Sequence, residues 1–437
     1  MSGIVGAVGL HASQAADEMR EALRHRGVAR SQVSGALANG LTYSMMELNT
    51  AKSSSISYTA STSTGVMDRL YTGYAQAQVI DVRFIALERD DIGSRPLFYG
   101  IDDAATLCAF ASERKALWAV GIEHALRVDP RVTVILDQHL RITTHAKNRL
   151  ESCQEPYNDE RCVANELLKL LKIVVDELAQ GQMAVAFSGG LDSSLLCSLS
   201  TNIAGKCHYT AGLIDSFDIR SARHAAHLMQ IELEAIELTL SDVQTLVPYV
   251  MEATESRNPL HIAISLPLYV LSREAKAAGF AKVLSGQGAD ELFAGYRKYV
   301  TLSSVAPEAL RAALRADVLN IAKDNLERDN LAAAANSIDV VLPYLDPRLV
   351  AFGLRINCAL KVRGGVSKYI LRRAAEQVMP RELAHKQKKA MQYGTGVTGA
   401  LRTLARNQLP HEVGKGQGAV GRYLQLLAEK HDIKVAE

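Results

Sequence analysis

The stretch Ala184-Val-Ala-Phe-Ser-Gly-Gly-Leu-Asp-Ser-Ser194 decides the fold of the second half of this 437-residue chain. An apolar run ends at Phe187, two glycines follow, and helix-forming residues begin directly afterwards. This order predicts a buried strand, a tight turn and a helix. The first amides of such a helix have no acceptor inside the helix, and with the helix dipole they favour an anion. Gly189 and Gly190 lack Cβ atoms, which lets a phosphate approach the backbone closely.

The polar side chains of this stretch indicate a phosphate that is bound together with a metal. Ser188, Ser193 and Ser194 supply hydroxyl donors. Asp192 alone would repel phosphate, so its presence makes sense if a divalent cation lies between the two. No G-x-x-x-x-G-K-[ST] sequence occurs, so the loop is not the P-loop of kinases and GTPases. The alternative interpretation is an ordinary turn in which Asp192 caps the helix.

The sequence around this stretch predicts a doubly wound parallel sheet. Strands and helices are expected to alternate, with strands at 183–187, 207–213 and 233–238 and helices at 160–179, 193–203 and 218–230. Asp159 is a candidate N-cap for the first helix. Ligands of such α/β sheets bind in the crevice at the carboxyl ends of the strands. Residues 305–437 are expected to be mainly helical.

A second glycine-rich loop and three later segments narrow the family. The loop lies within Lys282-Val-Leu-Ser-Gly-Gln-Gly-Ala-Asp-Glu-Leu-Phe-Ala-Gly-Tyr296 and carries a paired Asp290 and Glu291. Downstream follow Leu342-Pro-Tyr-Leu-Asp-Pro-Arg-Leu-Val350, Ser367-Lys-Tyr-Ile-Leu-Arg-Arg-Ala-Ala375 and Lys386-Gln-Lys-Lys-Ala-Met-Gln-Tyr-Gly394. The S-G-G-L-D-S-S septet resembles the pyrophosphate loop of the ATP-pyrophosphatases. Together these segments resemble the synthetase domain of asparagine synthetases over about residues 160–400.

The resemblance implies a site for ATP and Mg²⁺. Asp192 and Asp290 would hold the metal, and Lys388 would lie over the α-phosphate, with Lys386 or Lys389 as alternatives. Gln287 and Glu291 are further candidate catalytic residues. The ATP-binding residues implied by the resemblance are Phe187, Ser188, Gly189, Gly190, Leu191, Asp192, Ser193, Ser194, Leu213, Ser285 and Gly286.

Two positions depart from the synthetase pattern. Gln287 stands where asparagine synthetases have a glutamate that is thought to help deprotonate ammonia. A glutamine side chain can neither act as a base nor carry a charge. Ala263 falls where well-studied asparagine synthetases have an arginine. These departures weaken the prediction that aspartate is the substrate, but not the prediction that a carboxylate is adenylated.

The first part of the chain resembles class II glutamine amidotransferases. The segments that carry this resemblance are Met1-Ser-Gly-Ile-Val-Gly6, Ala22-Leu-Arg-His-Arg-Gly27, Arg89-Asp-Asp-Ile-Gly-Ser-Arg-Pro-Leu-Phe-Tyr-Gly100 and Ala111-Ser-Glu-Arg-Lys-Ala-Leu117. Ser2 replaces the nucleophilic cysteine, and a hydroxyl is a weaker nucleophile than a thiolate. The segment that supplies the oxyanion hole is missing from Ala51 onward. We expect a degenerate layered sheet domain at 1–148, a linker at 149–159 and the ATP-pyrophosphatase domain at 160–437.

Composition adds limits on partners and compartment. The net charge is +2 with no basic stripe, so nucleic acid is not indicated. No apolar run of 18 residues occurs, which argues against a membrane span. Six cysteines without metal-ligand spacing favour a reduced, cytoplasmic compartment. The family resemblance implies a homodimer.

The sequence thus predicts an enzyme that adenylates a carboxylate, most simply aspartate, and transfers an amine, most simply free ammonia. Two alternatives remain open. One is an amide-forming ligase or cyclase that acts on a carboxylate other than aspartate. The other is a catalytically silent ATP-binding or scaffold protein.

Overall fold

The computed structural model describes residues 2–49, 64–70, 73–80, 83–147, 156–178, 181–200, 205–305, 307–386, 394–409 and 417–436. Two compact units divide the chain. Apart from the last two residues, unit 1 comprises residues 1–151 and 322–339, and unit 2 comprises residues 152–321 and 340–435. Each unit is described by itself.

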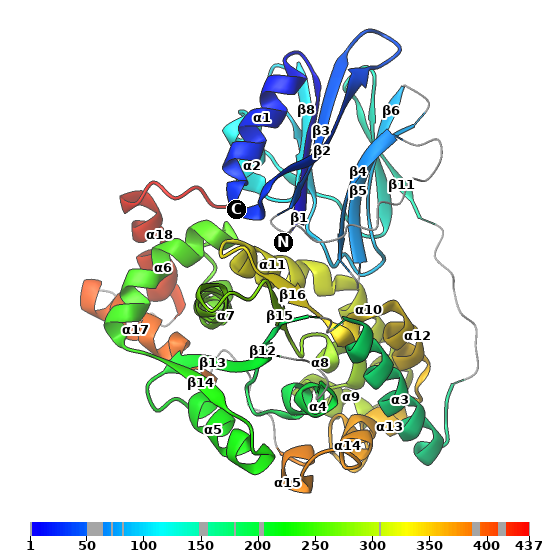
Figure 1. Cartoon of the computed structure of the whole chain (residues 1–437), viewed down its shortest axis with the longest axis vertical. Helices are drawn as coiled ribbons and strands as arrows, with labels where there is room; N and C mark the ends of the chain where they lie inside the picture. Colours follow the sequence, from blue (N-terminus) through cyan, green and yellow to red (C-terminus); the bar gives the residue numbers. More distant parts are fainter. Residues whose placement is uncertain are drawn as a thin grey trace. The chain divides into compact units, whose positions relative to one another are not determined.

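Unit 1 is built on two antiparallel sheets, drawn in blue and cyan in Figure 1. The first sheet has the order β2 (Val28–Ala36), β3 (Thr42–Asn49), β1 (Ser2–Gly9), β8 (Leu107–Ala111), β7 (Phe98–Ile101) and β9 (Leu126–Arg127). The second has the order β11 (Ile142–Ala146), β10 (Val132–Asp137), β6 (Phe84–Arg89), β5 (Gly73–Ile80) and β4 (Thr64–Leu70). Helices α1 (Ala12–Ala22) and α2 (Arg114–Ala119) cover the outer face of the first sheet.

Strand β1 shows why this arrangement is stable. Every residue of β1 is buried, and successive side chains point to opposite faces of the strand. Ile4 and Val8 join the core between the sheets, whereas Val5 and Ala7 join the core beneath α1 and α2. The strand that carries Ser2 is therefore the middle of a helix–sheet–sheet sandwich.

For unit 1 the sequence predicts β segments at 78–87 and 132–137 and one helix at about 14–25. The strand at 132–137 is confirmed, and the first helix covers Ala12–Ala22 with a short 3-10 turn at Arg24–Arg26. The single β segment expected at 78–87 is instead the facing parts of β5 and β6, which form an antiparallel pair. Residues 78–87 are rich in apolar residues at both ends, so their composition does not mark where one strand ends and the next begins.

Unit 2 contains the predicted parallel sheet. Its order is β14 (Leu233–Leu238), β13 (Cys207–Leu213), β12 (Ala184–Ala186), β15 (Lys282–Leu284) and β16 (Asp339–Val341). The β12–β13, β12–β15 and β13–β14 pairs are parallel. Helices α5 (Phe217–Met229) and α7 (Pro259–Ala277) both pack on β13 and lie on opposite sides of the sheet in Figure 1. The mixed α/β fold class is confirmed.

Helices form the rest of unit 2. The bounds are α3 (Glu160–Leu178), α4 (Leu191–Leu199), α6 (Leu240–Thr254), α8 (Ala289–Phe293), α9 (Arg297–Ser303), α10 (Pro307–Ile321), α12 (Pro347–Arg355), α13 (Cys358–Lys361), α14 (Tyr369–Ala375), α15 (Arg381–Ala384), α17 (Val397–Gln408) and α18 (Gln417–Lys430). Asp159 caps α3 as predicted, because its carboxylate accepts the amide of Cys162 at 2.6 Å. Helices α6, α7, α17 and α18 enclose one apolar core.

None of the helices in the described part of the chain is long and apolar enough to cross a membrane. Cys108 and Cys197 are buried, as expected for small core residues, and burial raises the pKa of Cys197 to about 11.

A buried lysine in α13 predicts how stability depends on pH. Burial lowers the pKa of Lys361 from 10.5 to about 8, so the unfolded chain binds its proton more tightly than the folded one. Stability should therefore rise between about pH 8 and 10.5. Lys361→Met should remove this rise and add up to about 3 kcal/mol at pH 7. Urea unfolding across this range measures the effect. The exposed Lys169→Met variant is the control, and an equal pH slope in all three proteins would contradict the prediction.

Candidate active site

The first glycine loop presents the start of α4 to its surroundings. Ser194 donates the first helical hydrogen bond, to the carbonyl of Gly190 at 3.0 Å, so the amides before it have no helical acceptor. Gly189 has a φ of +66°, and a Cβ there would lie 2.5 Å from the carbonyl oxygen of Ser221. Around Gly190, by contrast, only the Ser188 hydroxyl comes within 4 Å of a Cβ position. The loop is therefore packed against α5 at Gly189 and has open space at Gly190.

The serines of the loop differ in their surroundings. Ser188 is exposed, and its hydroxyl lies 3.1 Å from that of Ser193. The buried Ser194 hydroxyl has no hydrogen-bond partner in the described part of the chain. Buried hydroxyls are normally paired. These groups, with the helix start, make the loop suited to a polyanion.

The second glycine loop lies directly against the first. A Cβ at Gly286 would lie 3.1 Å from the Cβ of Asp192 and 3.4 Å from the amide nitrogen of Ser193. Gly288 caps α8 with a φ of +93°, which turns the chain so that Asp290 and Glu291 occupy the first turn of that helix. The two loops that the sequence singled out, after β12 and β15, are therefore brought together at the carboxyl ends of adjacent parallel strands.

One buried ammonium links the two loops. Lys368 Nζ lies 2.7 and 2.6 Å from the carboxylate oxygens of Asp192 and 2.7 Å from Oδ1 of Asp290. The Lys368 side chain is 3% exposed, and its burial lowers its pKa while Asp192 opposes that shift. Two carboxylates that would otherwise repel each other thus share a cation in a site of low dielectric constant.

Sequence reasoning assigned no role to Lys368, although its motif was recognised. The residue occupies the left-handed region, with a φ of +53°, just before α14. A non-glycine residue in this region is strained, and such strain gathers at functional sites. The signal available in the sequence was a single lysine within a family-like segment, which spacing alone cannot connect to either loop.

Tyr344 and Lys386 support the first loop. Sequence reasoning assigned no role to Tyr344 and named Lys386 as an alternative to Lys388 over the α-phosphate. Tyr344 donates its hydroxyl hydrogen to the carbonyl of Asp192 at 3.1 Å. Lys386 donates to the carbonyls of Gly189 and Ser221, at 3.1 and 3.2 Å, and so joins the loop to α5. Lys388, the predicted α-phosphate ligand, and Lys389 lie outside the described residues.

Glu291, Gln287 and Leu213 are the remaining candidates. Glu291 is buried, which raises its pKa, and it accepts a hydrogen bond from the Tyr296 hydroxyl at 2.5 Å. The amide of Gln287 donates to the Ser285 hydroxyl at 3.4 Å. Leu213 ends β13, and its amide donates to the carbonyl of Thr395 at 2.8 Å.

Unit 1 holds Ser2, the residue at the cysteine position of the amidotransferase pattern, close to two arginines. Ser2 is 6% exposed and lies in β1. Arg26 Nη1 donates to its carbonyl at 2.9 Å, and Arg95 Nη2 lies 3.5 Å from its hydroxyl. A guanidinium is a donor and cannot accept the hydroxyl proton. The stretch from Ala51 onward, where the family's oxyanion-hole segment is missing from the sequence, begins outside the described residues.

Comparisons with known proteins agree on one family. The family model described as Asparagine synthase matches residues 167–309 and 302–432. A putative glutamine-hydrolysing asparagine synthetase of Methanocaldococcus jannaschii is 30% identical over 79% of this chain and 72% of its own length. Asparagine synthetase B of Escherichia coli, also named as glutamine-hydrolysing, is 28% identical over 70% of this chain and 58% of its own. A probable asparagine synthetase of Dictyostelium discoideum is 30% identical over 52% of this chain and 46% of its own.

Two conclusions follow in turn. The fold is that of an α/β protein in which two glycine loops meet at the carboxyl edge of a parallel sheet. The comparisons show, further, that the chain belongs to the asparagine synthase family.

Close packing behind the paired carboxylates predicts the effect of one added methyl group. A Cβ at Gly295 would lie 1.8 Å from Asp290 Oδ1 and 2.3 Å from Lys368 Cε. Gly295→Ala must therefore displace the ion pair and should cost about 1–3 kcal/mol of stability. We also expect a loss of ATP binding, measured by titration calorimetry.

Gly399→Ala is the matched control, because no described residue outside the helix's own backbone lies within 4 Å of a Cβ at that helical position. It should raise stability by roughly 0.5–1 kcal/mol without affecting ATP binding. Equal behaviour of the two variants would show that the packing around Asp290 does not matter.

Proposed function

We propose that the chain is an ATP-dependent amide-forming ligase that adenylates a carboxylate and then transfers an amine to it. The observation that carries this proposal is the meeting of the two glycine loops, with Asp192 and Asp290 sharing Lys368 beside the open start of α4. Family membership supports the same reaction class. A silent scaffold has no need for a buried arrangement of this kind.

The chemistry balances in two steps. A carboxylate oxygen attacks the α-phosphorus of ATP, the bond from that phosphorus to the bridging oxygen breaks, and pyrophosphate leaves. The nitrogen lone pair of an amine then attacks the acyl carbon, the carbon–oxygen bond breaks, and AMP leaves with that oxygen while the nitrogen loses a proton. Preorganised donors that face the phosphates can stabilise the charge that develops in the first step.

The chain's own residues have separable tasks in this scheme. The Ser188–Ser194 loop binds the phosphates through its amides and hydroxyls, and Lys386 keeps that loop in position through the carbonyl of Gly189. Lys368 holds the two aspartates together and supplies positive charge next to the phosphates. Lys388 is proposed as the residue over the α-phosphate.

The two aspartates fit a magnesium ion. Among the described residues, no group of three or more His, Cys, Asp or Glu could hold a metal. Magnesium, however, is bound through one or two carboxylates together with the substrate's phosphates and waters. Asp192 and Asp290 supply these two hard oxygen ligands from facing loops. When bound, the ion would neutralise charge on the phosphates.

Ammonia from solution is the proposed amine. The curated relatives are named as glutamine-hydrolysing, whereas this chain carries Ser2, a buried strand residue, where the resembling amidotransferases have a cysteine. A hydroxyl is a weaker nucleophile than a thiolate, so we propose that unit 1 does not release ammonia from glutamine.

Aspartate is the first carboxylate to test, and a different acid is the second candidate. The specific observation in favour of the second is Ala263, which is 1% exposed within the apolar core of α6 and α7. A charged ligand for a substrate carboxylate therefore cannot come from this position. We propose a cytoplasmic enzyme that works as a homodimer on small molecules.

Pyrophosphate release tests the function directly. With Mg²⁺ and ATP, the protein should release pyrophosphate and form asparagine and AMP when aspartate and ammonium are supplied. Glutamine should not replace ammonium, and Ser2→Ala should change the ammonium-dependent rate by less than about twofold. Asp192→Asn is the inactive control.

Three results would change the account. Activity with glutamine that Ser2→Ala abolishes would mean that unit 1 is a working glutaminase. Release with another acid but not with aspartate would select the second candidate. No release with any carboxylate, despite ATP binding, would contradict the ligase proposal.

A further inference from the structure

One internal segment of the chain belongs to unit 1 although both of its neighbours in sequence belong to unit 2. Residues 322–339 lie between α10 and the last two residues of β16, yet they are part of unit 1. The segment starts with a π-helical turn, Ala322–Leu326, and continues as α11, Glu327–Ala334. Its other end, Asp339, is the first residue of β16.

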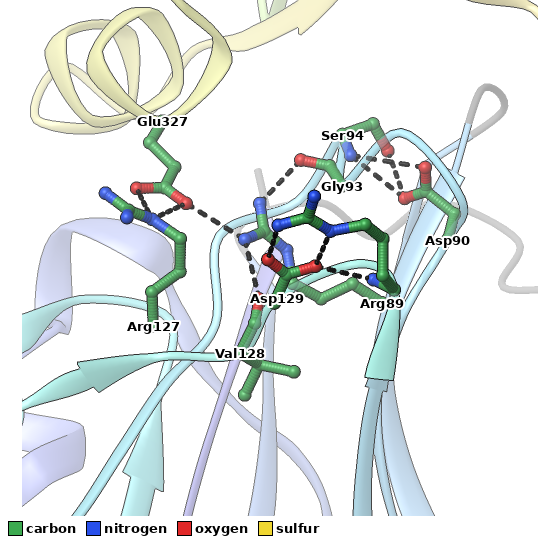
Figure 2. A network of polar contacts seen from close by, with 9 residues as sticks. Arg89, Asp90, Gly93, Ser94, Arg127, Val128, Asp129 and Glu327 are labelled. Carbon is green, nitrogen blue, oxygen red and sulfur yellow. Dashed lines mark hydrogen bonds and ion pairs between the residues drawn. The ribbon is translucent and has the colours of Figure 1, made fainter. Parts of the chain in front are cut away.

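A carboxylate of this segment is held by two arginines of unit 1. Figure 2 shows Glu327 of α11 directed at Arg127 and Arg89. Arg89 Nη1 lies 2.9 Å from Glu327 Oε1, and Arg127 Nε lies 2.6 and 2.7 Å from its two oxygens. The side chains of Arg89 and Glu327 are 0% and 5% exposed. Arg89 is fixed in turn by the carbonyls of Val128 and Gly93.

Two further contacts hold the middle of the segment. Arg26 Nη2 donates to Asn330 Oδ1 at 2.9 Å, and Arg26 itself is fully buried and paired with Glu113. The Ser337 hydroxyl donates to the carbonyl of His25 at 2.6 Å. Side chain and backbone of the His25–Arg26 turn thus both bind the segment.

The end of the segment is tied to the site through β16. Arg95 Nη2 donates to Asp339 Oδ1 at 3.0 Å, and both residues are buried. Two residues later, the carbonyl of Val341 accepts the amide of Ser285 at 2.9 Å. Ser285 begins the second glycine loop, which carries Asp290. An unbroken run of three residues therefore joins a buried ion pair of unit 1 to the loop.

Close packing leaves the segment little freedom at its start. Gly93 has a φ of +63°, and a Cβ there would lie 2.9 Å from the Cβ of Ala322 and 2.5 Å from Pro130. A side chain at position 93 would be strained in its backbone and would also push the segment away. The arginines at 89 and 95 flank this glycine, so one short motif binds both ends of the segment.

We propose that unit 1 acts as a positioning module for the second glycine loop. It binds residues 322–339 through Arg26, Arg89, Arg95 and Arg127 and thereby fixes β16 and the backbone that presents Asp290. Arg26, Arg89 and Arg95 belong to segments that resemble a glutamine-splitting domain. Their task in binding residues 322–339 does not depend on a nucleophile at position 2.

Buried charge is what makes this binding rigid. A guanidinium and a carboxylate that are taken out of water must remain together, because either one alone in the interior is strongly unfavourable. The segment therefore cannot leave its place in small steps. Such a connection transmits position, whereas exposed ion pairs of the Asp129–Arg131 type contribute little.

Backbone hydrogen exchange of the full-length protein tests the proposal without ATP. Glu327→Gln leaves two arginines without a negative partner, and we expect the amides of residues 285–291 to exchange roughly tenfold faster. Ser337→Ala removes a single hydrogen bond and should give a smaller change in the same direction. If Glu327→Gln does not fold, the exchange rates of Ser337→Ala at residues 285–291 test the proposal.

Asp137→Asn is the matched control. Asp137 is a buried carboxylate of unit 1 that pairs with Arg141 in the β10–β11 hairpin and is not part of the network around residues 322–339. This variant should destabilise unit 1 and leave exchange at 285–291 unchanged. The proposal is overturned if exchange rises within 322–339 but not at 285–291, or if Asp137→Asn has the same effect as Glu327→Gln.

The consequence for affinity rests on the proposed function. If the loop binds MgATP, Glu327→Gln and Ser337→Ala should raise the dissociation constant in the order of their exchange rates, with kcat changed less than KM. A wild-type protein that binds no ATP but shows the exchange pattern would refute the proposed function and leave the positioning role intact. If the wild-type protein binds ATP but exchange at residues 285–291 is the same in wild type and in both variants, the positioning role is refuted and the proposed function is left intact.

Discussion

The contact of Lys368 with Asp192 and Asp290 is the interaction on which the site depends. Two glycine loops end adjacent parallel strands, and each brings a carboxylate to the same place. Without a cation, the two charges would push the loops apart in an interior where screening by water is weak. The buried ammonium offsets that repulsion and fixes the distance between the loops. The strained backbone of Lys368 and the absence of a side chain at Gly295 both serve this contact.

Much of this architecture could be predicted from local sequence. The strands at 207–213 and 233–238 have the predicted bounds, and the helices at 160–178 and 217–229 differ by a residue at most, because alternating and helical apolar periods are strong signals. Glycine, serine and aspartate at the strand ends identified both loops. What joins the loops could not be predicted, because Lys368 is 176 residues from Asp192. Only the tertiary fold brings Lys368 to Asp192 and Asp290, and no periodic pattern in the sequence predicts this contact.

In unit 1, too, the contacts between distant segments could not be predicted from the sequence. The motifs of unit 1 were recognisable, and they resembled a glutamine-splitting domain in which Ser2 stands at the cysteine position. No sequence pattern indicated that Arg89, Arg26 and Arg95 bind a segment from the second half of the chain, since Glu327 is 238 residues from Arg89. Only the fold places these charges together. These three arginines bind the segment 322–339 through Asn330, Glu327 and Asp339.

Transfer of oxygen from the carboxylate to AMP tests the central claim most directly. The protein is supplied with ATP, Mg²⁺, ammonium and aspartate, or whichever acid supports turnover, labelled with ¹⁸O in the reacting carboxylate, and the products are analysed by ³¹P NMR. Attack at the α-phosphorus predicts that one labelled oxygen appears in each AMP and none in pyrophosphate. Label in inorganic phosphate, or unlabelled AMP alongside amide product, would contradict adenylation at the paired loops.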